Sequence, residues 1–122
     1  MQAEIVSSTG LTPRVAASLA YAGWWITGAL FWVLETRDPY VRFHAAQSLA
    51  AFGIIAAMIA AFATLAIASL SFLPGAFSPF VWAAMLTWGG GVILWVVAMW
   101  HAATGRVWRI PIAAELADRL SR

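Results

Sequence analysis

The side chains with the widest chemical repertoire in this sequence form one small set: Glu35, Tyr40, His44, Gln47, Ser48 and His101. At 100° per residue, the four from Tyr40 to Ser48 share one face of a helix. Glu35 and His101 end two other apolar segments, and we expect them at the same depth. This polar cluster could handle protons, bind a metal or bind a substrate, because ionisable groups at membrane depth are costly and often functional.

The polar cluster also has a purely structural interpretation, which we favour. Its members would be interfacial residues whose hydrogen bonds pin the first linker to the third apolar segment. A bis-histidine haem site and a Ser48, His44, Glu35 triad are further hypotheses. However, Ser48 and His44 share one helix turn, nothing supplies an oxyanion hole, and no HExxH, P-loop or GxGxxG motif is present. We therefore expect no enzyme activity, no catalytic residue, no metal and no cofactor.

The composition indicates a membrane protein. The chain has 122 residues, of which 63% are hydrophobic and 10% charged, against about 25% charged in soluble domains. It contains no cysteine, which excludes disulfides and thiolate chemistry. All seven cations are arginines beside apolar runs, so the net charge of +2 favours contact with a lipid surface over nucleic acid.

Three apolar segments position the polar cluster. Residues 15–34, 48–73 and 79–104 are each long enough to cross a hydrocarbon core of about 30 Å at about 1.5 Å per residue. Asp38 and Pro39 are typical of a helix start, so the second helix is expected to begin there and enter the membrane later. We predict an all-α polytopic fold with three transmembrane helices.

The ends of the chain complete the predicted organisation. Residues 1–14 form an N-terminal arm, residues 15–104 the membrane domain, and residues 105–122 a C-terminal tail. Within the tail, a helix from Pro111 to Leu120 is expected to lie flat on the membrane, as amphipathic interfacial helices do. Its apolar side holds Ile112, Leu116 and Leu120, and its polar side holds the i,i+4 pairs Glu115/Arg119 and Asp118/Arg122.

Arginine counts predict the topology. With three spans, Arg14 lies on one side, and the other side holds six arginines: Arg37, Arg42, Arg106, Arg109, Arg119 and Arg122. Basic residues favour the cytoplasmic side, so we predict an inner-membrane protein with the N-terminus outside and the C-terminus in the cytoplasm. Lipid headgroups are expected at Arg37, Arg42, Arg106 and Arg109.

Small residues predict close helix packing. The second span carries the ridges Gly53/Ala57/Ala61 and Ala56/Ala60/Thr64/Ala68, and the third carries Ala83/Thr87/Gly91. Such residues let helix backbones approach closely in a membrane. Three helices bury limited surface by themselves, so we expect a protein partner or a homo-oligomer as well as the lipid bilayer.

The run from Val41 to Ser48 resembles a known family. It is similar to small bacterial and archaeal membrane proteins of unknown function, related to the twenty-kilodalton Tic subunit of the chloroplast import translocon. The shared pattern is Thr27-Gly28, Glu35, VRFHA-x-QS over Val41 to Ser48, Gly105, the segment Arg106 to Arg109, and Pro111. The resemblance implies a three-span or four-helix membrane fold and, in the plastid relatives, protein translocation within a larger complex.

These observations give three hypotheses of function. The first is an accessory or scaffold subunit that packs through its small-residue ridges in a larger membrane assembly. The second is a homo-oligomeric, Tic-like transport or translocation component with Tyr40, His44 and Gln47 as its polar lining. The third is a metal or haem carrier built on Glu35, His44 and His101.

Overall fold

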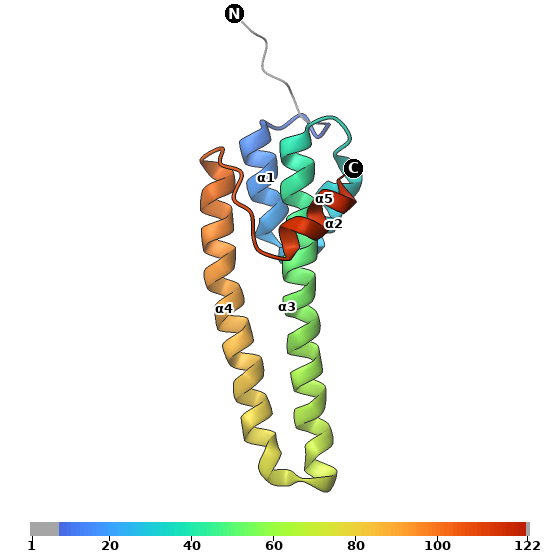
Figure 1. Cartoon of the computed structure of the whole chain (residues 1–122), viewed down its shortest axis with the longest axis vertical. Coiled ribbons are helices and arrows are strands. Elements are labelled where there is room, and N and C mark those ends of the chain that lie inside the picture. Colours follow the sequence, from blue (N-terminus) through green and yellow to red (C-terminus); the bar gives the residue numbers. More distant parts are fainter. Residues whose placement is uncertain (1–7, 122) are drawn as a thin grey trace, which may run out of the picture. The chain divides into compact units, whose positions relative to one another are not determined.

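The computed structural model describes residues 8–121, and the elements in this range are helical (Figure 1). In chain order they are α1 (Pro13–Ala22), α2 (Trp24–Leu34), α3 (Pro39–Phe72), the 3-10 helix η1 (Pro74–Ala76), α4 (Phe77–Ala103) and α5 (Ala113–Leu120). The predicted all-α class is confirmed. Residues 1–7 of the predicted N-terminal arm, and Arg122, lie outside the described residues.

The chain divides into two compact units. The first combines Met1–Gly53 with Trp95–Arg122, and we call it the arginine unit because all seven arginines fall in it. The second, Ile54–Leu94, contains no charged residue, and we call it the apolar unit. The polar cluster belongs entirely to the arginine unit, so the candidate site is built there.

The first apolar segment is not the single span that the sequence predicts. It forms two short helices, α1 and α2, that double back as a helical hairpin (Figure 1). The backbone N–H of Ser8, before α1, donates to the carboxylate of Glu35, after α2, at 2.9 Å. Each helix is about 15 Å long, half of a hydrocarbon core. Residues 15–34 therefore enter and leave at the same end of the unit.

Two helical segments are long and apolar enough to cross a membrane. They are Pro39–Phe72, which contains an 18-residue window with a mean hydropathy of 2.4, and Pro74–Ala103, where the corresponding value is 1.8. At about 1.5 Å per residue α3 extends about 51 Å, more than the hydrocarbon core needs. Its first turns are free to pack within the arginine unit, as the sequence predicts for a helix that starts at Pro39.

Small side chains allow the hairpin to pack tightly on α3. The core of the arginine unit contains Ala16, Ala20, Phe31, Val41 and Ala45, from all three helices. Three of these five residues are alanines, so the helix backbones approach closely around one aromatic ring. This packing fixes the hairpin against the face of α3 that carries the polar cluster.

Four helix ends meet at one end of the arginine unit. The hydroxyl of Tyr40, at the start of α3, donates to the carbonyl of Ala102, at the end of α4, at 2.7 Å. The guanidinium of Arg14, in α1, lies so close to Gly105 that an added Cβ there would be 2.8 Å from Nε. The prediction that the two termini lie on opposite sides of the membrane assumed that residues 15–34 form one span. These residues form a hairpin instead, so the opposite placement no longer follows.

The C-terminal helix packs on protein. Residues Ala113, Ala114 and Ala117 of α5 are buried, and Leu120 accepts a hydrogen bond from Trp32 Nε1 at 2.9 Å. Ile112 and Leu116, from the predicted apolar face, are exposed. The helix therefore begins two residues later than predicted and ends at the predicted residue, Leu120. The face that it buries differs from the predicted one, and its contact with the membrane surface stays a prediction.

Candidate functional site

The hairpin turns at Gly23 and Trp24. Gly23 has φ −104°, and Trp24 has φ 58°, in the left-handed region that non-glycine residues seldom adopt. A break in a helix leaves backbone carbonyls and N–H groups without their intrahelical partners. At membrane depth no water replaces those partners, so side chains must supply them.

Two hydroxyl groups supply partners at the turn. Ser48 Oγ, on α3, lies 2.9 Å from the carbonyl oxygen of Ala20 and 2.7 Å from that of Trp24, placed to donate to either. Thr27 Oγ1, on α2, donates to the same Ala20 carbonyl at 2.9 Å and accepts the N–H of Gly23 at 2.8 Å. Ser48 thus links α3 to both arms of the hairpin.

A tryptophan and a glycine complete what we call the hairpin lock, which comprises Thr27, Gly28, Ser48 and Trp95. The indole Nε1 of Trp95, on α4, donates to the carbonyl of Tyr21 at 2.9 Å. A Cβ added to Gly28 would lie 2.7 Å from the backbone nitrogen of Leu49 and 2.9 Å from Ser48 Cβ. Only glycine lets α2 come this close to α3, and this approach brings Ser48 within reach of the turn.

His44 and Gln47 form a second buried network with Tyr21. Gln47 Nε2 donates to the Tyr21 hydroxyl at 2.8 Å, and that hydroxyl lies 2.7 Å from His44 Nδ1. The Tyr21 hydroxyl also has a proton of its own to donate, and His44 Nδ1 is the possible acceptor beside it. This favours the neutral His44 tautomer with its proton on Nε2. His44 and Gln47 are 1% and 0% exposed, so they line no open path through this chain.

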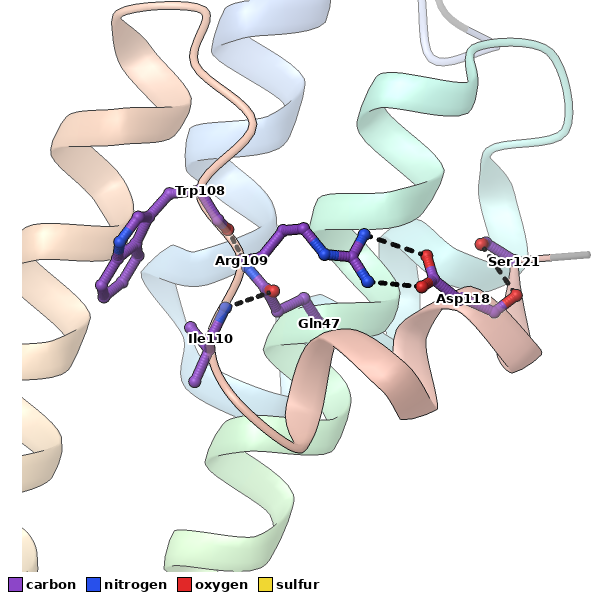
Figure 2. A network of polar contacts seen from close by, with 6 residues as sticks. All are labelled: Gln47, Trp108, Arg109, Ile110, Asp118 and Ser121. Carbon is purple, nitrogen blue, oxygen red and sulfur yellow. Dashed lines mark hydrogen bonds and ion pairs between the residues drawn. The ribbon is translucent and has the colours of Figure 1, made fainter.

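Gln47 also fixes the tail, as Figure 2 shows. Its Nε2 donates to the carbonyl of Trp108 at 2.8 Å, and its Oε1 accepts the N–H of Ile110 at 2.9 Å. Further along, Arg109 forms an ion pair with Asp118 of α5 (Figure 2). One amide side chain on α3 thus joins α1, α3 and the segment that leads into α5.

The remaining histidine is a packing residue. The ring of His101 stacks on Trp108, with centroids 4.9 Å apart and planes 15° apart, and its Nδ1 contacts the carbonyl of Val97 at 2.8 Å. The ring of Tyr40 contacts that of His44 edge-on at 4.6 Å. His101 therefore packs the tail against α4, and none of these contacts joins it to the first linker.

Glu35 binds a different part of the chain. Its carboxylate accepts the backbone N–H groups of Ser8, Arg37 and Asp38 and the Ser8 hydroxyl, at 2.8–2.9 Å for the shortest contact of each. Burial raises the pKa of this carboxyl, but the hydrogen bonds outweigh that effect and hold its pKa below the ordinary value. No contact among the described residues joins Glu35 to His44 or His101, so the predicted convergence of these three is not found.

The predicted headgroup arginines separate into two kinds. Arg37 and Arg106 are exposed and remain candidates for lipid contact. Arg42 Nη1 instead donates to the carbonyls of Trp32 and Glu35, at 2.9 and 2.8 Å, and so closes the C-terminal end of α2. Arg109 is also engaged within the chain, through its ion pair with Asp118.

The geometry offers no metal centre among residues 8–121, where no group of three or more His, Cys, Asp or Glu side chains is placed to hold an ion. Within that range, His44 Nε2 is the one buried side-chain nitrogen or oxygen atom without a hydrogen-bond partner inside 3.5 Å. One imidazole nitrogen does not make a metal site. The haem and metal hypothesis gains no support from this arrangement.

Three residues of the site do not stand out in the sequence. Tyr21 and Trp95 sit inside apolar runs, where a ring facing lipid is the simplest expectation. Their polar atoms are the available signal, because a buried Tyr hydroxyl or Trp N–H needs a partner. Gly23 gives a weaker signal, since glycine occurs in many membrane helices without breaking them.

Comparison with known proteins places the chain in a family. A family model described as the magnetosome magnetite crystal formation protein family matches residues 11–117. The chain belongs to this family. A UPF0132 membrane protein of Methanocaldococcus jannaschii is 32% identical over 120 residues, which cover 95% of this chain and 94% of the relative. Another from Archaeoglobus fulgidus is 32% identical over 100 residues, 82% of this chain and 92% of the relative.

These matches confirm the prediction that the chain belongs to a family of small prokaryotic membrane proteins. A second M. jannaschii UPF0132 membrane protein is 28% identical over 116 residues, 93% of this chain and 73% of the relative. Together with the two apolar helices, the relatives locate this chain in a membrane. No solved structure matches. The relation to the Tic subunit stays a resemblance carried by the motif.

Proposed function

We propose that this chain is a non-enzymatic membrane protein that acts as an accessory or scaffold subunit of a larger membrane assembly. The observation that carries the proposal is the use of its polar residues. Glu35, Gln47 and Ser48 are buried and direct their hydrogen bonds at other parts of the same chain. Residues engaged in this way stabilise the fold and do not bind a substrate. The proposed function therefore uses the outer surface of the protein, through contact with other subunits.

The apolar unit presents a surface suited to another helix. Four small residues on α3 are exposed, and no described part of the chain covers them: Ala57, Ala60, Ala61 and Thr64. In lipid, small residues allow backbone approach, which supplies the packing that associates helices. Gly53 and Gly91, also predicted for packing, are half-buried and buried within the chain. The exposed four support a lateral partner.

The family description names magnetite crystal formation, and for this chain we favour a role in organising the membrane over contact with mineral. Contact with iron calls for clustered carboxylate or imidazole ligands. Residues 8–121 contain no such group, and four of the chain's five acidic side chains fall in that range. Their charge is also outweighed by arginine, which suits anionic lipid better than iron.

We further propose that both termini lie in the cytoplasm. The hairpin and the four meeting helix ends bring Arg14 to the same end as Arg37, Arg42 and Arg106. Every arginine that the structure describes then falls on one side of the membrane, which the preference of basic residues for the cytoplasm favours more strongly than the six-to-one division predicted for three spans.

Native mass spectrometry of the protein extracted from its own membrane tests the scaffold role. We expect a defined complex with other subunits. Ala57→Leu should reduce the co-purified partner at least tenfold, because the longer side chain blocks close helix approach. Ala63→Leu is the matched control, since Ala63 is also exposed, on another flank of α3.

Two outcomes would overturn the scaffold role. A wild-type protein that is extracted without any partner contradicts it directly. If Ala57→Leu and Ala63→Leu retain the same partner in the same ratio, the small-residue surface is not the interface.

Single-cysteine variants test the topology, because the chain has no cysteine of its own. In right-side-out membrane vesicles, an impermeant maleimide should label Gly75→Cys, in the turn before α4. Thr12→Cys and Thr104→Cys should react only after the membrane is permeabilised. Labelling of Thr12→Cys in intact vesicles, with Thr104→Cys protected, would instead support three spans.

A further inference from the structure

The arginine unit contains an open apolar groove between α1 and α4. Its larger part has a volume of about 350 Å³ and is lined by Ser18, Trp95, Val96, Met99, Trp100 and Ala103. A smaller part of about 190 Å³ is lined by Arg14, Val15, Ser18, Leu19 and Ala103. Ser18 and Ala103 line both parts, so the hollow beside the arginine and the one beside the tryptophans are adjacent.

The apolar walls of the groove suit a hydrocarbon chain. Ser18, its polar lining residue besides Arg14, directs its hydroxyl to the carbonyl of Arg14 at 2.9 Å and so offers no proton to the groove. The Trp95 N–H is likewise bound to Tyr21. Along α4 the groove extends about 12 Å from Ala103 to Trp95, less than half of a hydrocarbon core.

The head of the groove carries positive charge. Arg14 is exposed, and its guanidinium lies against Gly105, directly before the exposed Arg106. Among the described residues the one ion pair is Arg109 with Asp118, so no described carboxylate forms an ion pair with Arg14, the cation that lines the groove. A guanidinium presents a planar fork of donors that matches the oxygens of a phosphate.

We propose that the groove holds one phospholipid with an anionic headgroup, its phosphate on Arg14 and one acyl chain along Trp95 and Met99. Charge complementarity selects this occupant over other apolar molecules, because a cation heads an otherwise apolar groove at one end of a membrane unit. Basic pockets between helices on the cytoplasmic side bind anionic lipid headgroups in this manner. The proposal requires the arginine end to lie at headgroup depth, and it does not depend on the scaffold role.

Lipid competition followed by native mass spectrometry tests the site. The purified protein is incubated with equimolar phosphatidylglycerol and phosphatidylethanolamine of matched acyl chains. We expect one phosphatidylglycerol to be retained in at least tenfold excess. Arg14→Gln should remove this preference, and Arg14→Lys should restore part of it, because a lysine keeps the charge without the fork.

Two more variants separate a built site from general surface charge. Ala103→Phe fills the groove from an exposed position and should lower the retention of both lipids while Arg14 is still present. Arg37→Gln removes an exposed arginine that does not line the groove and should retain the wild-type preference. Thermal unfolding of each variant confirms that the fold is intact.

The proposal fails if wild-type protein retains the two lipids equally, which would mean ordinary surrounding lipid. It also fails if Arg37→Gln loses the preference as fully as Arg14→Gln, which would mean attraction to net charge alone. The lipid ratio is independent of co-purified protein, so failure here is distinguishable from failure of the scaffold role.

Discussion

The two units of this chain differ in how far their side-chain hydrogen bonds reach along the sequence. In the arginine unit, Gln47 and Ser48 bond to groups on other elements, 24 to 63 residues away in sequence. In the apolar unit, Thr64, Ser69 and Thr87 bond to carbonyls of their own helix, three or four residues back. The first kind of contact specifies a tertiary arrangement, whereas the second leaves a helix as it would be alone. The particular fold is therefore encoded in the arginine unit.

Glycine substitutions should show this difference most strongly. Gly28→Ala places a Cβ 2.7 Å from backbone in the hairpin lock, and we expect a loss of about 1–3 kcal/mol in unfolding free energy. Gly90→Ala meets open space in the apolar unit and should stabilise its helix by about 0.5–1 kcal/mol. Thermal unfolding in detergent measures both. A shift of the same sign in the two variants would contradict the comparison.

The next largest effect is expected at Gln47. Gln47→Ala leaves the buried N–H of Ile110 without its partner, which costs about 1–3 kcal/mol, and it releases the tail from α3. Trypsin should then cut after Arg106 or Arg109 several-fold faster than in wild type. The control is Thr87→Val, which removes a hydroxyl that bonds only within α4. Equal cleavage rates in Gln47→Ala and wild type would show that other contacts hold the tail.

A serine pair gives a smaller and sharper contrast. Ser48→Ala removes the donor that faces two carbonyls at the hairpin turn, and membrane hydrogen bonds of this kind contribute about 0.6 kcal/mol on average and at most about 1.7. Ser69→Ala removes an equally buried hydroxyl that bonds to its own helix. We expect the cost of Ser48→Ala to exceed that of Ser69→Ala in chemical unfolding. Equal losses of unfolding free energy in the two variants would show that the hydrogen bonds of Ser48 to the hairpin turn contribute no more than a bond within one helix.

The smallest effect is a pH dependence confined to the arginine unit. The pKa of Glu35 lies below its value in the unfolded chain, about 4.3, so the folded state binds fewer protons there. Its contribution to stability is complete above the unfolded pKa and is lost as the pH falls through the lower folded pKa. Between pH 7 and pH 3, the unfolding temperature of wild type should fall more than that of Glu35→Gln. Parallel curves would contradict this assignment.

The sequence predicts the long helices well, because their signals are local. Asp38 and Pro39 mark the start of α3, and the Asp38 carboxylate accepts the Tyr40 N–H at 2.8 Å, as a helix cap does. Pro74 and Gly75 mark the turn before α4. Hydropathy likewise identifies the two long apolar helices. These features depend on neighbouring residues and need no knowledge of the tertiary structure.

The hairpin could not be predicted in the same way. Residues 15–34 have the length and hydropathy of a span, and nothing in their own composition separates a straight helix from a broken one. What stabilises the break lies elsewhere in the chain, at Ser48 and Trp95. The motif residues Thr27, Gly28 and Ser48 were identified by resemblance, but their joint purpose is visible only once α2 and α3 are in contact.

The ion pair that the structure shows in the tail could not be predicted for a related reason. Spacing predicts Asp118 with Arg122, a pair that stays a prediction because Arg122 lies outside the described residues, whereas the structure shows Asp118 with Arg109, nine residues earlier. An i,i+4 rule considers one helix only. Arg109 lies outside α5, in the segment that precedes it, and its side chain reaches Asp118 on the helix.

The hairpin turn also bears on the biosynthesis of the chain. During translation α1 and α2 are made before Ser48, and Trp95 follows only when most of α4 has been completed. Until then the carbonyls of Ala20, Tyr21 and Trp24 lack these donors, while the same apolar stretch is long enough to cross the bilayer as one helix. The nascent chain can therefore insert these residues either as one spanning helix or as the hairpin. Trp95 is the last residue of the hairpin lock to be synthesised, and its hydrogen bond stabilises the hairpin.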